Sequence, residues 1–278
     1  MFRPKISVVV CAKNEGERIR ASLECIKAVG PDEIVVVDGN SSDNTAAIAR
    51  EYTDHVVISD AGSLTRDRQV GIDAATHDLI AMIDADHRIK PGDLEGLWHD
   101  MEEFGFHMVQ SLIGIEDKGF WCRAESEAFD VFLNTPGPKK MIGTAPALYK
   151  REIFSEVQFD DHITRNKDDA DFIYRLYTNG KYKFGHGRTY IWQEHFCAFR
   201  EYVKKFAWYG RGDAEFCRKH MNRAPSMFFH LFIRYPVLRP LKALFMGKFR
   251  AIPYLVVCGL VRGFSMTKAL LLHLLKGS

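Results

Sequence analysis

The sequence predicts an α/β fold in which a mostly parallel sheet has helices on both faces and is followed by an amphipathic helical tail. In the first half of the chain, short β-branched runs alternate with helix-sized segments. These runs are apolar at nearly every position, which is typical of parallel strands buried on both faces. In the last third the alternation stops, and aromatic residues are interleaved with bases.

The predicted strands of the first half are "ISVVVCA", "EIVVVD", "HVVI" and "DLIAMIDAD". The helices between them are "EGERIRASLECIKAV", "NTAAIAREY" and "RDRQVGIDAA". After Pro91 we expect a helix in "LWHDMEEFGF", strands in "HMVQSLIGI" and "MIGTAPALY", and a helix in "DADFIYRLYTNG" that stops at Gly180. A long helix is predicted over residues 199–220. The helices beyond it are expected to be broken by three prolines, Pro236, Pro240 and Pro253.

Composition places the chain among globular proteins, because 278 residues with 46% hydrophobic content can bury a large core. The six cysteines form no C-x-x-C pair, which argues against a zinc cluster or a disulfide framework. The N-terminal apolar run, residues 6–12, is too short for a signal peptide. We therefore predict a cytoplasmic protein with reduced thiols.

Charge divides the chain into two parts. Residues 196–278 contain 15 Lys and Arg against three acids, a balance of +12. The whole chain carries +2, so residues 1–195 carry −10. This asymmetry predicts two domains, 1–195 and 196–278, with different partners.

Polar residues collect directly after three predicted strands, at Asn14 and Glu15, at Asp38 to Ser42, and at Asp84 to His87. Ligands of open α/β sheets bind at the carboxyl ends of the strands, so the three segments should converge. Asp84 and Asp86 have strand spacing and would point to the same side. Two neighbouring carboxylates repel unless a cation compensates them, and oxygen ligands suit Mg²⁺ or Mn²⁺. The alternative is a pair of strand-end or helix-capping acids.

Five segments occur in an order and spacing that resemble family 2 glycosyltransferases with the GT-A fold. They are "SVVVCAKNEGERI", "EIVVVDGNSSDNT", "RDRQVG", "DLIAMIDADHRIKPGDL" and "NKDDADFIYRL". The resemblance covers roughly residues 4–210 and depends on all five segments together. It implies a GT-A fold and transfer of a sugar, with inversion, from a nucleotide-sugar to an acceptor.

The resemblance also implies roles for individual residues. Those expected to hold the nucleotide-sugar donor are Ala12, Asn14, Glu15, Asp38, Gly39, Arg68 and Asp84. Asp86 would bind the metal, and His195 would contact the metal or the diphosphate. Two alternatives remain open: Arg68 could form a surface ion pair with Asp67 or Asp73, and a lone histidine such as His195 could be structural.

The same resemblance assigns the catalytic base to Asp169, with Asp171 expected to pair with Arg175 one helical turn later. The alternative is that Asp168, Asp169 and Asp171 only favour the start of a helix through its dipole. No Q-x-x-R-W pattern is present, which weighs against a processive polysaccharide synthase. "FSEVQFDDHITRN" replaces the Gly-Gly-aromatic turn of many relatives, so the acceptor stays open.

The basic, aromatic tail predicts peripheral association with an anionic membrane surface. Its longest uncharged run, residues 251–261, is shorter than the ~20 residues of a transmembrane helix. Packing against the core, a homodimer interface and nucleic-acid binding are alternatives, of which the last is weakest because the acidic body repels phosphates.

Together these expectations predict a metal-dependent, non-processive glycosyltransferase on the cytoplasmic face of the membrane. Its expected acceptor is a lipid-linked saccharide. The rival functions are a nucleotidyltransferase and a membrane-surface binding module that keeps the fold without catalysis.

Overall fold

The computed structural model describes residues 4–276, apart from 161–162, 164–165, 195 and 197. The chain divides into two compact units. The first comprises Met1–Gly114, Thr135–Thr164 and Asp168–Glu194, and the second comprises Ile115–Asn134, Arg165–Lys167 and His195–Ser278. The second unit thus adds residues 115–134 to the basic C-terminal region.

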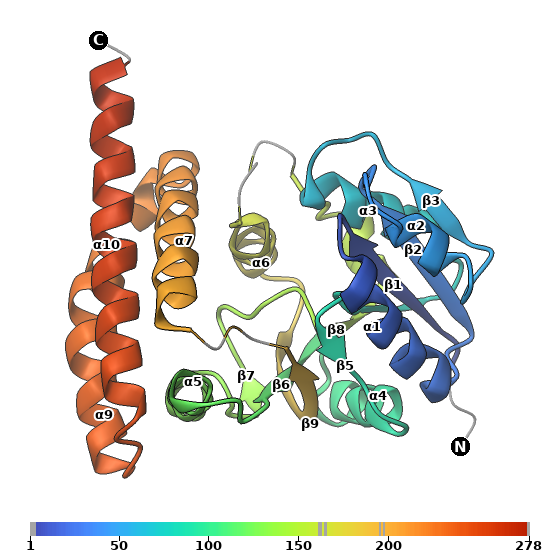
Figure 1. Ribbon diagram of the computed structural model, residues 1–278, viewed down its shortest axis with the longest axis horizontal. Helices are drawn as coiled ribbons and strands as arrows, with labels where there is room; N and C mark the ends of the chain where they lie inside the picture. Colours follow the sequence, from blue (N-terminus) through green and yellow to red (C-terminus); the bar gives the residue numbers. More distant parts are fainter. Residues whose placement is uncertain (1–3, 161–162, 164–165, 195, 197, 277–278) are drawn as a thin grey trace. The chain divides into compact units, whose positions relative to one another are not determined.

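The first unit is built on a mixed sheet with the strand order β3-β2-β1-β4-β8-β6-β9-β5, and β7 pairs with β9 (Figure 1). The strands are β1 (Ile6–Ala12), β2 (Glu33–Asp38), β3 (Val56–Ile58), β4 (Leu79–Met82), β5 (His87–Arg88), β6 (Met108–Ile115), β7 (Gly137–Pro138), β8 (Ala147–Lys150) and β9 (Phe184–Gln193). The strands β3, β2, β1 and β4 are mutually parallel, and β8 joins antiparallel to β4. The predicted α/β class is confirmed.

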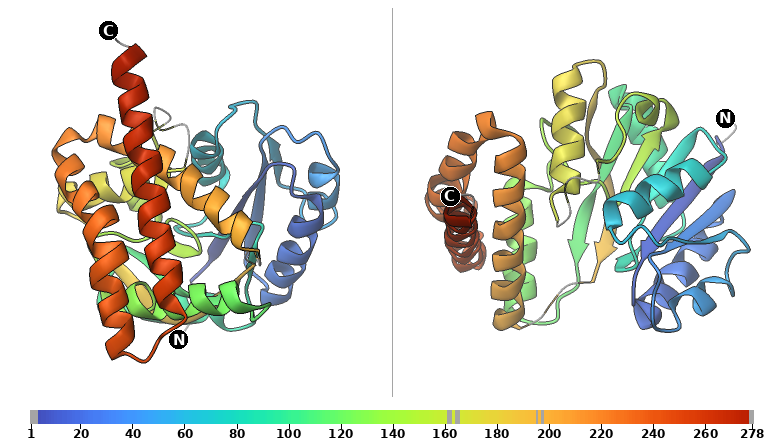
Figure 2. Two further views of the ribbon diagram at one scale, coloured as in Figure 1. Left: turned by 60° about the vertical axis from the view of Figure 1, so that its left-hand side comes forward. Right: turned by 90° about the horizontal axis from the view of Figure 1, so that it is seen from above.

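Helices cover both faces of this sheet (Figure 2). They are α1 (Gly16–Val29), α2 (Thr45–Ala49), α3 (Leu64–Ala74), α4 (Asp93–Phe104), the short 3₁₀ helix η1 (Arg151–Ser155) and α6 (Asp168–Asn179). Apolar side chains of α1, α2 and α4 pack on one face, and those of α3, η1 and α6 pack on the other. Strand residues alternate between these two cores, which explains why the strands are apolar throughout.

Local sequence features determine where α3, the helix that carries Arg68, begins and how closely it packs on the sheet. The Ser63 hydroxyl accepts a hydrogen bond from the Arg66 backbone N–H and caps the start of α3. At Gly71 an added Cβ would lie 2.4 Å from the Val9 side chain of β1, so only glycine lets α3 pack this closely on the sheet. This close packing sets the position from which Arg68 reaches the strand ends.

The second unit is helical. It contains α5 (Phe120–Phe132), α7 (Phe199–Lys219), η2 (Met221–Arg223), α8 (Ala224–Phe229), the π-helical η3 (His230–Leu238), α9 (Arg239–Phe245) and α10 (Ala251–Lys276). The helix α5 was not expected from any sequence pattern. Its buried Glu125 accepts hydrogen bonds from the hydroxyls of Tyr202 on α7 (2.8 Å) and Tyr254 on α10 (2.7 Å), and so ties three helices together.

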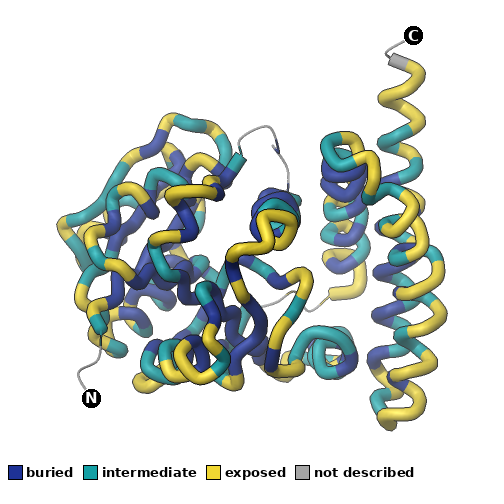
Figure 3. The backbone as a smooth tube through the Cα atoms, turned by 180° about the vertical axis from the view of Figure 1, so that it is seen from behind, coloured by how far each residue is buried: buried dark blue, intermediate teal, exposed yellow. Residues whose placement is uncertain are grey.

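The expectation that prolines would break the C-terminal helices is wrong for α10. Pro253 lies in the first turn of α10, where a missing N–H costs no helical hydrogen bond. Residues 251–275 are therefore one apolar helix, long enough by length and composition to cross a membrane, although a third of its most apolar window is buried in protein. Figure 3 shows α10 buried along part of its length and exposed over its last turns.

Candidate active site

The carboxyl ends of β1, β2 and β4 bring three predicted segments to one edge of the sheet. Ala12, the last residue of β1, pairs in register with Asp38, the last residue of β2. The Gly39 N–H then donates to the Ala12 carbonyl at 2.9 Å. Asp84 follows β4, the neighbour of β1 on its other side. The parallel topology explains this convergence, because parallel strands end at the same edge.

The loops after β1 and β2 are joined to each other. The Asn14 side-chain oxygen accepts from the Ser42 backbone N–H at 2.8 Å, and the Asn14 N–H donates to the Ser41 hydroxyl at 2.9 Å. Asn14 has a positive φ of 56°, which asparagine tolerates better than most residues. Asn14 therefore shapes the loop, with its amide oxygen already used inside the protein.

Asp38 presents a buried acceptor. Its Oδ1 accepts from the Ser41 N–H at 2.6 Å, whereas its Oδ2 is buried without a hydrogen-bond partner among the described residues. A buried, unsatisfied carboxylate oxygen is costly, and a ligand N–H or O–H would relieve it. At Gly39 beside it, an added Cβ would lie 2.8 Å from Asp67 Oδ2, so that side chain would have to shift.

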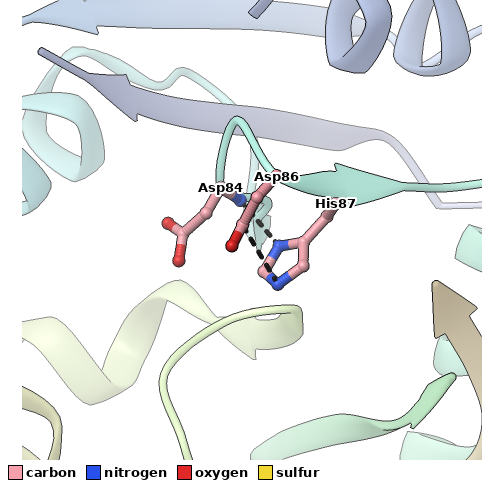
Figure 4. Close-up of side chains that lie close together, drawn as sticks. All are labelled: Asp84, Asp86 and His87. Atoms are coloured by element: carbon pink, nitrogen blue, oxygen red, sulfur yellow. Dashed lines mark hydrogen bonds and ion pairs between the residues drawn. The ribbon is translucent and has the colours of Figure 1, made fainter. Parts of the chain in front are cut away.

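Asp84, Asp86 and His87 form a compact group in the turn after β4 (Figure 4). One ligand atom from each lies within 4.8 Å of the others. The two carboxylate side chains are 33% and 30% exposed, so they are open to a ligand. Glu15 belongs to the same electrostatic environment: burial raises its pKa, Arg18 opposes this, and Asp86 raises it further.

Arg68 links this turn to a segment far away in the sequence. Its guanidinium forms a hydrogen-bonded ion pair with Asp168 at the start of α6, and its Nη2 lies 3.5 Å from Asp84 Oδ2. Burial alone would lower the pKa of Arg68, but Asp168 and Asp84 outweigh burial and raise it, so the side chain stays charged. The alternative of a surface ion pair with Asp67 or Asp73 is wrong, because Arg68 is only 6% exposed.

The start of α6 carries the predicted base. Asp169 is partly exposed, and its Oδ1 accepts from the Ala170 N–H at 2.6 Å. Asp171 is buried and pairs with Arg175 Nε at 2.8 Å, as predicted. Asp168 forms the ion pair with Arg68. The three acids of "DDAD" are thus in three different environments, and all three lie in the first turn of α6, where the helix dipole favours an acid.

The sequence analysis assigned no individual role to three contributors to this site. His87 is 1% exposed and directly follows the carboxylate pair. Gln193, at the end of β9, donates from its amide to Asp86 Oδ2 at 2.9 Å. Asp168 was grouped with the helix-start acids. Adjacency to Asp86 could have indicated His87, whereas no sequence signal connects Gln193 or Arg68 to partners about a hundred residues away. His195 lies outside the described residues.

The residues present fit a small divalent cation. Asp84 and Asp86 offer carboxylate oxygens, the ligands preferred by Mg²⁺ and Mn²⁺. Arg68 compensates part of the charge of Asp84, which leaves Asp86 as the acid with the greater need of a cation. Asp86 and Asp84 would hold such an ion.

Comparison with known proteins identifies the family. The sequence model of glycosyl transferase family 2 matches residues 7–158, more than half of the chain. The chain belongs to this family. The matched region contains β1 to β8 and the carboxylate turn, while α6 with Asp169 lies beyond it.

Relatives of this family 2 glycosyltransferase are named as glycosyltransferases or sugar transferases. An uncharacterised glycosyltransferase of Mycobacterium bovis is 34% identical over 98 residues, covering 35% of this chain and 44% of the relative. An undecaprenyl-phosphate 4-deoxy-4-formamido-L-arabinose transferase of Yersinia enterocolitica is 28% identical over 166 residues, covering 54% of this chain and 50% of the relative. The matches thus span half or less of these relatives.

Among solved structures, a mannosyltransferase of Pyrobaculum calidifontis in complex with GDP-Man and Mn²⁺ has a TM-score of 0.60 at 15% identity. The alignment covers 96% of this glycosyltransferase and 76% of that chain. The likeness confirms the predicted GT-A fold.

Proposed function

We propose that this glycosyltransferase is metal-dependent and inverting, and that it transfers one sugar from a nucleotide-sugar to a lipid-linked acceptor. The observation that carries the proposal is the arrangement around Arg68. One buried guanidinium joins the carboxylate turn after β4 to the helix start that presents Asp169. The acids proposed to bind the donor and the proposed base are thereby held near each other, and a two-substrate transfer depends on such positioning.

The reaction can be written from these positions. The acceptor hydroxyl oxygen attacks the anomeric carbon and forms the new glycosidic bond, while the bond from that carbon to the diphosphate breaks. The nucleoside diphosphate leaves with the bonding electron pair. Asp169 takes the acceptor hydroxyl proton. When bound at Asp86 and Asp84, the divalent ion would neutralise negative charge on the diphosphate.

The donor nucleotide is assigned to the ends of β1 and β2. The unsatisfied Asp38 Oδ2 supports this assignment, because a nucleotide base or ribose supplies the N–H or O–H donor that this oxygen lacks. The mannosyltransferase with bound GDP-Man and Mn²⁺ adds support at the level of the fold. The lipid-linked acceptor draws on the undecaprenyl-phosphate transferase relative.

The product of donor turnover tests this function. Purified protein with Mn²⁺ and a panel of nucleotide-sugars, first ranked by thermal shift, should release nucleoside diphosphate from one of them. Transfer to a polyprenyl-phosphate or polyprenyl-linked saccharide should accompany that release. Pyrophosphate as the product would indicate a nucleotidyltransferase instead. A protein that binds vesicles but turns over no donor would be a binding module.

We further propose that the second unit lies on an anionic bilayer and does not cross it. Although α10 is long enough to span, its partner α7 packs along it: Asp213 of α7 binds Arg262 through two 3.0 Å hydrogen bonds, and the Ser265 hydroxyl donates to Ala207 O at 2.7 Å. A spanning α10 would bring exposed charges of α7 into hydrocarbon, at about 2.5–3.5 kcal/mol each near the bilayer centre. These charges include Arg200, Lys204, Arg211 and Arg218.

The apolar surface of η3, α9 and the turn after α9 suits an in-plane arrangement. Its exposed members are Ile233, Val237, Leu238, Leu241, Leu244, Phe245, Met246 and Phe249. Phe245 is 88% and Phe249 is 63% exposed, values unusual for such large apolar side chains in water. Arg234 is exposed among them and supplies charge for anionic headgroups, while the ammonium of the exposed Lys242 donates to the Val131 carbonyl at 2.6 Å.

Replacing both phenylalanines should weaken membrane binding. We expect the double variant Phe245→Ser, Phe249→Ser to bind phosphatidylglycerol-containing vesicles at least about tenfold less tightly, since burial of one Phe contributes about 1.5–3 kcal/mol. Vesicle co-sedimentation at several salt concentrations measures this affinity for the vesicles. Ile58→Ser, at an exposed position on β3, serves as the control. Equal binding by the double variant and the wild type would contradict the assigned surface.

A further inference from the structure

His87 adds ring nitrogens to the carboxylate turn, and its role depends on which of them carries the proton. Its side chain is almost completely buried, and its Nδ1 accepts a hydrogen bond from the Asp84 backbone N–H at 2.9 Å. A backbone N–H can only donate, so Nδ1 must present a lone pair. A neutral imidazole has one N–H, which therefore lies on Nε2.

This tautomer decides between two roles for Nε2. As a metal ligand, Nε2 would have to offer a lone pair, and with Nδ1 already accepting a hydrogen bond the ring would have to lose its last proton. As a hydrogen-bond donor, Nε2–H needs no change of protonation. Nε2 lies 3.7 Å from Asp86 Oδ1 and has no hydrogen-bond partner among the described residues (Figure 4).

Two further contacts hold Asp86 in place. Its Oδ2 accepts from the Gln193 amide at 2.9 Å, and its backbone carbonyl accepts from the Glu194 N–H at 2.8 Å. His87 and Gln193 face each other in the β5–β9 ladder, so the two side chains approach Asp86 from paired strands. An ionised carboxylate has about four lone-pair sites, so each oxygen can accept a hydrogen bond and still bind a cation.

We propose that His87 is a positioning residue that donates from Nε2–H to Asp86 and does not bind the metal. The divalent ion of the proposed function, on which this inference rests, then receives carboxylate oxygens but no nitrogen from this turn. The 3.7 Å separation exceeds hydrogen-bond length by about 0.5 Å, so the donation requires a small movement of the Asp86 side chain. The arrangement favours Mg²⁺ and Mn²⁺ over the softer metals that select imidazole.

The matched variant is His87→Asn. The Asn side-chain oxygen can take the place of Nδ1 as acceptor for the Asp84 N–H, so the turn keeps that bond while the donor toward Asp86 is lost. We expect Mn²⁺ affinity, measured by isothermal titration, to fall about tenfold or more, the range found when hydrogen-bond partners of metal ligands are removed. The melting temperature should change little. An unchanged affinity would contradict the positioning role.

Spectroscopy separates positioning from ligation. Electron spin echo modulation of protein-bound Mn²⁺ reports directly coordinated nitrogen, and we expect the same nitrogen signal in the wild type and in H87N. Loss of a coordinated-nitrogen signal in H87N would overturn the proposal. Because the comparison is between these two proteins, a contribution from any other histidine cancels.

A measurement on the unmutated, metal-free protein covers the case in which H87N does not fold. Long-range ¹H–¹⁵N correlation spectra of ¹⁵N-histidine protein should show His87 protonated at Nε2 and bare at Nδ1, and Mg²⁺ should not change this pattern. Protonation at Nδ1 would refute the inference. If the tautomer and the Mn²⁺ results are as expected but no nucleotide-sugar is turned over, then the proposed function fails and the role of His87 stands.

Discussion

Asp169→Asn should lower kcat for sugar transfer by about 10²- to 10⁴-fold, the usual contribution of a positioned general base. Asparagine keeps the size of the side chain and can still accept from the Ala170 N–H, so the start of α6 should remain intact. It cannot take the acceptor hydroxyl proton. The donor contacts on β1, β2 and β4 are untouched, so the Kd for the nucleotide-sugar should stay near its wild-type value. Steady-state kinetics and donor titration measure the two effects.

Asp171→Asn on the same helix is the matched control. It removes a negative charge two residues away and breaks the ion pair with Arg175, so it should lower the melting temperature while kcat stays near wild type. If both variants lose activity equally, the acids act through the helix and not through a base. Near wild-type transfer by Asp169→Asn would remove Asp169 from the catalytic assignment altogether.

Asp86→Ala should abolish stimulation by Mn²⁺ or Mg²⁺ together with activity. A divalent ion on the diphosphate contributes several kcal/mol to the transition state, and about 1.4 kcal/mol corresponds to tenfold in rate. Turnover should therefore fall by at least about 10²-fold. Removing the ion from the wild type with EDTA should cause a loss of similar size, reversed by added Mn²⁺. Nucleoside diphosphate release against metal concentration is the measurement.

Asp54→Ala controls for the loss of an acid as such, since Asp54 is exposed and precedes β3 at the amino ends of the parallel strands. It should keep the wild-type metal dependence. Full activity of EDTA-treated wild type would show that the carboxylates of the turn act without a metal. In that case Asp86 would have to serve the donor directly, through the hydrogen-bond network with Gln193.

Some features of this protein were predictable because they are local. The pairing of Asp171 with Arg175 follows from the geometry of a helix, in which residues four apart are neighbours. The prediction that Pro253 would break a helix also concerned a local feature, and it was wrong. The effect of Pro253 depends on whether it falls in the first turn of a helix or in the interior, and boundaries are the least certain part of a sequence-based assignment.

Other features depend on contacts between segments that are far apart in the sequence. Arg68 meets Asp168 from 100 positions away, and Gln193 reaches Asp86 across 107. In the second unit, Glu125 joins α5 to Tyr254 across 129 residues. Periodicity and spacing report what a segment buries but not which distant segment it meets, so none of these partners could be read from the sequence.

The sequence by itself determined the parallel α/β core and the placement of Asp84 and Asp86 at its carboxyl edge, because buried strands and their ends have local apolar patterns. Only the tertiary structure decided the partners of those acids: Arg68 beside Asp84, and His87 and Gln193 around Asp86. The physical reason is that burial and hydrogen-bond geometry decide what a charged side chain can do, and both arise only when distant segments pack together.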